Sequence, residues 1–255
     1  MTNQPLVSII TVVFNGEKHL QQTIDSVYNQ TYKNIEYIIV DGKSTDNTIN
    51  IIQNNKNKIT KWISEPDKGL YDAMNKGISL ANGQLIGTIN SDDWYQSNAV
   101  ELSVIAYINH PKAKIIHANR FDVYPNNTKK EFKFNPSAFK FLYFNMTYSH
   151  PTMFVVKEEY QKHKYSIKLK SSSDYQFILE AFLNDKNGFV HIPKPIVNFR
   201  LGGISAQLSF FDELKEAYLA RKSAGMKTYK CCFALLLKFF LNPIVVLKRV
   251  LNKNS

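Results

Sequence analysis

Cysteine is nearly absent from this sequence of 255 residues. The only two cysteines, Cys231 and Cys232, are adjacent, which excludes a disulfide framework and a CxxC-type metal site. Such sparse use of cysteine is typical of a reducing compartment. The first residues, MTNQPLVSII, lack the basic segment, long apolar stretch and small-residue cleavage site of a signal peptide. We therefore expect the protein to stay in the cytoplasm.

Glycine-rich phosphate-binding loops are missing as well. The stretch GKST at 42–45 ends like a P-loop, but the glycine that GxxxxGK[ST] requires at position 37 is Tyr37. Neither GxGxxG nor the nucleophile motif GxSxG occurs, and His and Cys show no zinc spacing. A divalent cation bound by oxygen atoms fits the carboxylates of the sequence better.

Positive charge is concentrated at one end of the chain. The net charge is +11, but eight Lys and Arg and no Asp or Glu lie between 217 and 255, so the rest of the chain carries only +3. A basic groove spread over the fold is therefore not indicated. We expect no nucleic-acid partner.

The first hundred residues alternate between apolar stretches and amphipathic ones. Apolar residues make up 44% of the sequence, which is enough for a substantial core. Strands are predicted at 6–14, 35–40, 59–64 and 85–90; helical faces are predicted from Leu20, Ile24 and Val27, from Ile49 and Ile52, and from Tyr71, Met74, Ile78 and Ala81. Gly83 suits the C-terminal cap of the third helix. This alternation predicts right-handed βαβ crossovers and an α/β fold with a parallel sheet.

The pattern is less regular after residue 95. We predict a helix in AVELSVIAYI, a strand in AKIIHANRFDVY and a helix from about Asp174 through Phe182. Residues 125–150 are aromatic and irregular. The stretch FVHIPKPIVNFRLGGIS is interpreted as a strand, a turn and a Gly-Gly loop.

Three carboxylates follow predicted strands. Asp41 comes after the second strand, and Asp92 and Asp93 come after the fourth. Ligands of open α/β sheets bind outside the carboxyl ends of the strands, so all three should lie at the same edge. Two adjacent carboxylates can form a solvated turn or hold a cation against a phosphorylated ligand. Their expected convergence with Asp41 favours the ligand.

Five segments resemble, in order, family 2 glycosyltransferases of the GT-A fold, most closely the bacterial enzymes of colanic-acid, O-antigen and capsule synthesis. The segments are PLVSIITVVFN, IIVDGKSTDNT, EPDKGLYDAMNKG, LANGQLIGTINSDDWY and SSDYQF. The resemblance spans roughly 5–205 and is strongest over 5–95. It implies a Rossmann-like sandwich with a mainly parallel central sheet, in a domain 1–210 with a nucleotide-binding half at 1–95 and an acceptor half at 96–210. Helices and a basic amphipathic tail would follow at 211–255.

The resemblance implies roles for the residues at the expected sheet edge. Thr11, Val13 and Phe14, at the end of the first strand, would pack on the nucleoside of a nucleotide sugar. Asp41 would accept a hydrogen bond from the uracil or the ribose, and Asp92 would contact the ribose.

Further roles concern the cation and the acceptor. Asp93 would bind a Mn²⁺ or Mg²⁺ ion that bridges the diphosphate, and Asp174 would be the general base of an inverting transfer. The resemblance adds four more residues to the nucleotide-sugar site: Asp72, Asn75, Lys76 and Arg200.

Several of these residues have a structural alternative. Val13 and Phe14 could belong to the core, Asp41 to a helix-capping turn, and Asp174 to the N-cap of its own helix. His150 either lines the acceptor side or is a core histidine with a satisfied hydrogen bond.

The sequence also departs from the family pattern. Asn90 stands where the common DSDD motif has its first carboxylate, and Asp41 is the only carboxylate where DDG is usual. Met74 replaces the arginine of the common ARN.G motif. Lys76 could substitute for that arginine, although as a point charge without a planar fork.

The segment 231–251, CCFALLLKFFLNPIVVLKRVL, is apolar but interrupted by Lys238 and Pro243. Its uninterrupted apolar pieces are shorter than the roughly 20 residues that a spanning helix needs. Because basic residues surround it, we expect an interfacial anchor on an anionic membrane surface. The alternative is a C-terminal helix packed on the domain.

These expectations combine into one function: a metal-dependent inverting glycosyltransferase at the inner face of the cell membrane. It would move a sugar from a UDP-sugar to a saccharide acceptor linked to a lipid, such as a polyprenyl diphosphate, in bacterial surface polysaccharide synthesis. Two alternatives stay open. A nucleotidyltransferase would use a similar cation, but this sequence has no glycine-rich triphosphate loop near residue 15. A non-catalytic membrane-associated scaffold would bind the nucleotide sugar without turnover.

Overall fold

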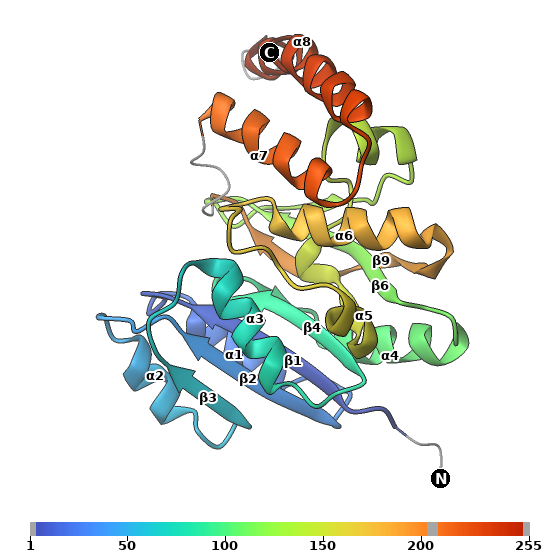
Figure 1. Cartoon of the computed structure of the whole chain (residues 1–255). Coiled ribbons are helices and arrows are strands. Elements are labelled where there is room, and N and C mark those ends of the chain that lie inside the picture. Colours follow the sequence, from blue (N-terminus) through green and yellow to red (C-terminus); the bar gives the residue numbers. More distant parts are fainter. Residues whose placement is uncertain (1–3, 203–208, 252–255) are drawn as a thin grey trace.

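A nine-stranded sheet runs through the residues that the computed structural model describes, 4–202 and 209–251 (Figure 1). The strand order is β3-β2-β1-β4-β8-β6-β9-β5, with β7 paired to β6. Part of the predicted Gly-Gly loop after Arg200 lies outside the described residues.

The first half of the sheet is parallel, as the alternation of the sequence predicts. Its strands are β1 (Val7–Val13), β2 (Ile35–Asp41), β3 (Lys61–Ser64) and β4 (Leu85–Asn90). The connecting helices are α1 (Leu20–Tyr28), α2 (Thr48–Asn54) and α3 (Leu70–Leu80). All seven residues of β1 are buried because β1 is a central strand with helices on both faces.

The second half of the sheet is mixed. Strand β8 (Phe154–Val156) pairs antiparallel with β4 and β6 (Ile115–Val123), whereas β9 (Phe189–Arg200) runs parallel to β6. The remaining elements up to residue 200 are β5 (Trp94–Tyr95), α4 (Ala99–Asn109), β7 (Lys129–Phe132), η1 (Lys140–Phe144), η2 (His150–Thr152), α5 (Lys157–Lys162), α6 (Ser173–Asn184) and η3 (Lys186–Gly188).

Strand β9 continues through IPKPIV as a bulged strand and ends at Arg200, and Leu201 and Gly202 form a turn after it. The register with β6 shifts so that Ala118 pairs with Ile192 but Asn119 pairs with Pro195. Proline has no N–H to donate to a ladder, and such residues are confined to edges and bulges. The two prolines therefore mark an irregularity within the strand.

Gly83 does not cap α3. The helix ends at Leu80, and Ala81 follows it in an extended conformation. A Cβ at Gly83 would lie 2.5 Å from the Ser8 backbone nitrogen and 2.8 Å from the Leu6 carbonyl oxygen. The position needs glycine because the chain passes directly against β1 before entering β4.

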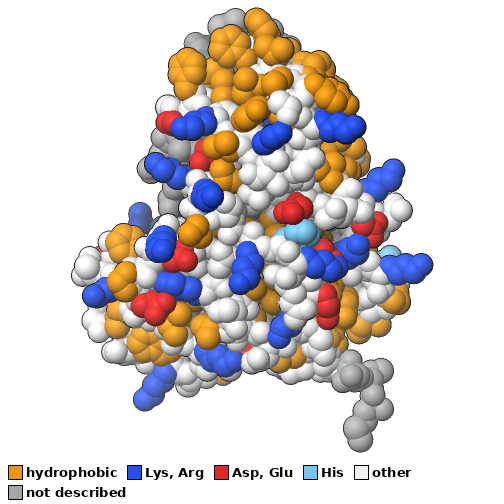
Figure 2. Space-filling view, viewed as in Figure 1, with side chains coloured by type: hydrophobic (Ala, Val, Ile, Leu, Met, Phe, Trp, Pro, Cys, Tyr) orange, Lys and Arg blue, Asp and Glu red, His pale blue; other side chains and the backbone are white. Residues whose placement is uncertain are grey.

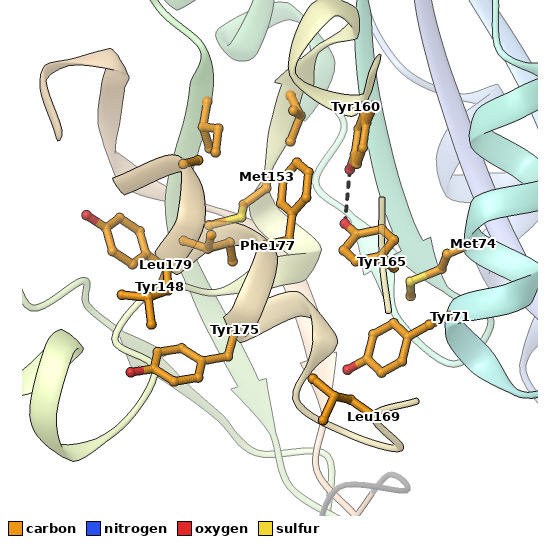
Figure 3. Packing of buried hydrophobic residues seen from close by; sticks show 14 of the residues in the cluster. Tyr71, Met74, Tyr148, Met153, Tyr160, Tyr165, Leu169, Tyr175, Phe177 and Leu179 are labelled. Carbon is orange, nitrogen blue, oxygen red and sulfur yellow. Dashed lines mark hydrogen bonds between the residues drawn. The ribbon is translucent and has the colours of Figure 1, made fainter. Parts of the chain in front are cut away.

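Alternate residues of the central strands feed two hydrophobic clusters on opposite faces of the sheet. Ile10 and Val12 of β1 belong to the cluster shared with α3 and α6, and Ile9 and Val13 to the cluster shared with α1, α2 and α4. In the first cluster, Tyr71 and Met74 extend from α3 toward Tyr165 (Figure 3). The sheet thus fixes α3 and α6 on one face, where both contribute to the site described below.

Two helices follow the sheet and pack against η1 and α6. They are α7 (Phe210–Ser223) and α8 (Thr228–Leu251). Arg221 of α7 is fully buried, donates to the Leu142 carbonyl oxygen at 2.8 Å and lies over the Tyr175 ring. Among the described residues, no helix has both the length and the apolar character to cross a membrane.

Glu36, at the start of β2, joins the strands at the edge opposite to their carboxyl ends. Its buried carboxylate accepts hydrogen bonds from Ser8 Oγ at 2.6 Å, Lys61 Nζ at 2.8 Å, and the Asn82 backbone N and Nδ2 at 2.8 and 2.7 Å. Burial opposes ionisation, but the hydrogen bonds outweigh it and hold the pKa of Glu36 at about 2.

Replacing Glu36 by Gln should lower the free energy of unfolding by about 2–3 kcal/mol at pH 7, because a charged group with several buried hydrogen bonds is lost. The folded-state pKa lies below the ordinary 4.5, so this stabilisation is complete above that pH and declines as the pH falls toward 2. Urea denaturation should show a smaller difference at pH 3.5 than at pH 7. Glu158→Gln, at an exposed position of α5, is the control. A difference independent of pH would contradict the assignment.

Candidate active site

The register of the parallel strands sets the geometry of the site. Val13 of β1 pairs with Asp41 of β2, and Val12 pairs with Asn90 of β4. The ends of β2 and β4 therefore flank the end of β1, so that Asp41 and the acidic segment after Asn90 lie on either side of it.

Asp41 is fully buried and holds the loop that follows it. Its carboxylate accepts hydrogen bonds from the Ser44 backbone N at 3.0 Å, from Ser44 Oγ and from Ser64 Oγ at 2.6 Å. These contacts bind the carboxylate to its own loop and to the end of β3, and none of them caps α2, which begins at Thr48.

The three residues expected to meet the nucleoside differ in exposure. Thr11 is fully buried, and its Oγ1 accepts a hydrogen bond from the Tyr37 hydroxyl at 3.1 Å. Val13 is also buried, whereas the Phe14 side chain is 63% exposed. The core alternative thus describes Val13 but not Phe14, and Thr11 lies inside the fold.

Asp67, a residue that sequence reasoning missed, lies close to Gly42 and Phe14. A Cβ at Gly42 would lie 2.4 Å from Asp67 Oδ2 and 3.5 Å from Phe14 Cβ. Asp67 therefore reaches the end of β2 from the segment before α3, where its Oδ1 accepts from the Gly69 N–H at 2.8 Å. The only signal for Asp67 is its place in the segment EPDKG.

Asp93 and Asp92 face different environments. Asp93 is 1% exposed; its Oδ1 accepts from the Arg200 backbone N and its Oδ2 from Asn90 Nδ2, both at 2.8 Å. Burial, together with the neighbouring charge of Asp92, raises the pKa of Asp93 to about 7. In the described part of the chain, no hydrogen bond or ion pair engages the half-buried Asp92 carboxylate. Each oxygen of Asp93 thus already accepts one hydrogen bond from the protein, whereas Asp92 accepts none through its carboxylate from the described residues, which makes Asp92 the alternative candidate for the cation.

Arg200 lies next to the acidic segment. Its Nε donates to the Asp92 carbonyl oxygen at 3.2 Å, its Nη2 donates to Gln22 Oε1 at 3.0 Å, and its guanidinium lies 5.0 Å from the centre of the Trp94 ring. Lys129 Nζ lies 5.3 Å from the same ring. Two cationic side chains thus lie near the Trp94 ring. Their charge could bind a polyphosphate beside Asp92.

The three predicted residues of α3 have other partners. Asn75 is tied to the backbone of Tyr165, donating to its carbonyl oxygen at 2.8 Å and accepting from its N–H at 3.1 Å. Lys76 Nζ lies 2.9 Å from Glu65 Oε1 and 3.6 Å from Asp72 Oδ2. Asn75 thus joins α3 to the segment before α6. Both polar atoms of its amide are used by the Tyr165 backbone.

Asp174 lies within the first turn of α6. Its Oδ1 accepts from the Tyr71 hydroxyl at 3.0 Å and from the Tyr175 backbone N at 2.8 Å. The N-cap position is Ser172, so the capping alternative for Asp174 is wrong. The buried His150 matches the core alternative, since its Nε2 lies 2.7 Å from the Tyr165 hydroxyl and burial lowers the pKa of its imidazole.

The residues present fit a divalent cation only in cooperation with a ligand. Among the described residues, no group of three His, Cys, Asp or Glu is arranged to hold a metal ion. Mg²⁺ is commonly bound by one or two carboxylates together with substrate phosphates. Asp92 provides such a carboxylate, so a bound diphosphate would have to complete the coordination.

Comparison with known proteins gives a consistent result. Residues 8–163 match the model of the family "Glycosyl transferase family 2". The chain is 28% identical over 216 residues to a chondroitin synthase of Pasteurella multocida, covering 83% of this chain and 22% of that protein. It is also 28% identical over 258 residues to an uncharacterised glycosyltransferase of Methanocaldococcus jannaschii, covering 96% of this chain and 88% of that protein. The chain spans about a fifth of the length of the first curated relatives.

Solved structures share the fold. S. aureus TarS in complex with UDP-GlcNAc superposes with a TM-score of 0.72 at 17% identity, covering 92% of this chain and 71% of that one. The mannosyltransferase PcManGT from Pyrobaculum calidifontis, in complex with GDP-Man and Mn²⁺, gives 0.62 at 13% identity, covering 93% and 70%. The expected GT-A fold is thus confirmed.

The exchange of roles between the two carboxylates can be tested by binding. Asp92→Asn should weaken Mn²⁺-dependent binding of UDP at least about tenfold, because the carboxylate that has no partner among the described residues is lost. Asp93→Asn should keep the Mn²⁺ enhancement within about threefold, because its oxygens serve Arg200 and Asn90. Isothermal titration with Mn²⁺ and with EDTA measures both, with thermal unfolding as the control for folding. A larger loss in Asp93→Asn would restore the original assignment.

Proposed function

Because the chain belongs to glycosyl transferase family 2 and is a glycosyltransferase, we propose that it transfers a sugar from UDP to a saccharide acceptor with inversion at the anomeric carbon. The observation that carries this proposal is a pair of carboxylates held by different parts of the fold. Asp92 stands at the carboxyl edge of the sheet beside Arg200, and Asp174 is held by Tyr71. Asp92 is suited to binding the donor, and Asp174 is suited to taking a proton from the acceptor.

The donor site that we propose is the edge around the end of β1. Phe14 is exposed there for contact with a nucleoside, and Asp41 and Asp67 lie next to Gly42 at the end of β2. UDP as the nucleotide is supported by the TarS complexes with UDP and UDP-GlcNAc. A Mn²⁺ or Mg²⁺ ion on Asp92 would offset the negative charge of the leaving diphosphate when bound.

In the transfer step, the acceptor oxygen attacks the anomeric carbon from the face opposite the diphosphate. The new carbon–oxygen bond forms as the bond to the phosphate oxygen breaks, and Asp174 takes the hydroxyl proton. Arg200 contributes positive charge beside the departing UDP. No covalent enzyme intermediate is needed, because attack and departure take place on opposite faces.

The proposal divides the chain into a nucleotide-binding half at 1–95, an acceptor half at 96–210 and C-terminal helices at 211–255. The division is supported by the parallel strand order of the first half and by the start of α7 at Phe210. Family membership favours neither a nucleotidyltransferase nor a non-catalytic scaffold.

The acceptor that we propose is linked to a lipid, as in surface polysaccharide synthesis at the inner face of the membrane, and α8 supplies the membrane contact. From 229 to 241 every exposed side chain of α8 is apolar or a thiol. These residues are Tyr229, Cys232, Phe233, Leu236, Phe239, Phe240 and Leu241. Hydrophobic side chains gather over α8 in Figure 2. Exposed apolar patches of this kind mark interaction surfaces.

The inner face of α8 explains the interruption at Lys238. This lysine is 9% exposed, and its Nζ lies 2.6 Å from Glu213 Oε1 of α7. The helix is thus packed on the domain through one face, as the packing alternative expected, while the opposite face is free of charge among the described residues. Lys227 and Lys230 lie close by in the sequence, which favours an anionic surface. Lys248, Arg249 and Lys253 belong to the same tail, but their side chains lie outside the described residues.

The membrane proposal predicts that Phe233→Ser/Leu236→Ser/Phe240→Ser weakens binding to phosphatidylglycerol vesicles at least about tenfold, because each apolar side chain contributes burial in the interface. Sedimentation with vesicles at low and high salt measures the effect. Ile105→Ser/Ile108→Ser, at exposed positions of α4, is the matched control. Unchanged binding of the triple variant would contradict the proposal, and a dimer that the triple variant dissociates would assign the face to a second copy.

The proposed base predicts that Asp174→Asn lowers turnover at least about a hundredfold, the scale of losing a general base. Donor affinity and thermal stability should stay near wild type, because Asn keeps the size of the side chain and an acceptor for Tyr71. A screen of nucleotide sugars with Mn²⁺ identifies the donor, and release of nucleoside diphosphate with a panel of acceptors then measures turnover. Turnover within a few-fold of wild type would remove Asp174 from the mechanism.

A further inference from the structure

We propose that Tyr71 is a positioning residue for Asp174: its hydroxyl fixes one carboxylate oxygen so that the other is presented to the acceptor. The inference rests on the proposed function, in which Asp174 is the base. It concerns a residue of α3 that is 103 positions away from Asp174 in the sequence and touches it only through the fold.

The hydrogen bonds to Asp174 are asymmetric. The Tyr71 hydroxyl and the Tyr175 backbone N–H both donate to Oδ1, at 3.0 and 2.8 Å. No described residue donates to Oδ2, and the Asp174 side chain is half-buried. A carboxylate held in this way has one oxygen occupied and one available, which is the arrangement that a base for an incoming hydroxyl requires.

Tyr71 itself is rigidly held. It is 4% exposed, and its ring lies 5.7 Å from that of Tyr165 (Figure 3). Tyr165 is fixed in turn by His150 Nε2 at 2.7 Å from its hydroxyl and by two backbone hydrogen bonds with Asn75, one turn after Tyr71 on α3. The phenol of Tyr71 therefore has a defined direction. Its conformational entropy is lost when the protein folds and not when the substrate binds.

The same helix reaches the donor side. The segment before α3 carries Asp67, which lies against Gly42 at the end of β2, and α3 starts three residues later at Leu70. One rigid element thus contacts the donor edge through the loop before it and the base through its first turn. A tyrosine at 71 links the position of the base to the half of the protein that binds the donor.

The charge environment of Asp174 is simple. Its charge acts on the phenols of Tyr71 and Tyr165 and on the buried imidazole of His150, whose pKa is lowered by burial. Glu216 of α7 lies further along the segment, held by the backbone N–H groups of residues 170 and 171. Burial and the Asp174 charge raise the pKa of Tyr71 well above its ordinary value, so the phenol remains a donor.

The test compares Tyr71→Phe with Tyr165→Phe, using the donor and acceptor that the screen identifies. Tyr71→Phe keeps the ring and should fold, while turnover should fall about tenfold with KM for the donor unchanged within about threefold. Tyr165→Phe removes a buried phenol whose hydrogen bonds go to His150 and Tyr160, and it should lower turnover less than Tyr71→Phe does.

Two outcomes separate this inference from the function on which it rests. In an Asp174→Asn background, Tyr71→Phe should cause no further loss of turnover, because its effect passes through the carboxylate. Wild-type turnover in Tyr71→Phe, with Asp174→Asn inactive, would overturn only the positioning role. Full turnover in Asp174→Asn would overturn the base and the positioning role together.

Discussion

The hydrogen bond from the Arg200 backbone amide to Asp93 is the contact on which the geometry of the donor edge depends. It joins the segment after β4 to the end of β9, 107 residues away, at the point where β5 and β9 pair. The carboxylate that makes it is buried, with a pKa raised to about 7, so the structure keeps a group that is costly to ionise. Asp93 is thus held by Arg200 and Asn90, and the preceding carboxylate, the half-buried Asp92, is left without a partner among the described residues.

A second constraint comes from the sheet. The parallel register brings the ends of β2 and β4 to either side of β1, and α3 crosses the same face of the sheet as α6. Residues that are distant in the sequence, such as Tyr71 and Asp174, therefore meet without any long loop. A small number of packed elements holds the donor edge and the base in one rigid frame, which is how a direct displacement between two bound substrates gains orientation.

Much of this frame could be predicted from the sequence, because apolar periodicity determines which segments are strands and which faces of helices are buried. The four parallel strands and the helices between them follow from that pattern, and so does the position of Asp41 and Asp92 after strands. The direction of individual side chains does not follow from it. The inward turn of Asp93, the burial of Thr11 and the use of Asn75 to bind a backbone depend on tertiary contacts with Arg200, Tyr37 and Tyr165. Gly83 and the bulge at Pro195 were missed for a related reason, since close backbone approach and register shifts involve partners far along the chain.

The central claim is that the donor diphosphate is held through a cation on Asp92 at the carboxyl edge of the sheet. A crystal grown with UDP and Mn²⁺, measured at a wavelength where manganese scatters anomalously, tests it most directly. The account predicts an anomalous peak about 2.1 Å from a carboxylate oxygen of Asp92, the spacing of a small hard cation, with diphosphate oxygens completing its coordination. A peak bound to Asp93, or UDP bound away from the end of β1, would contradict it.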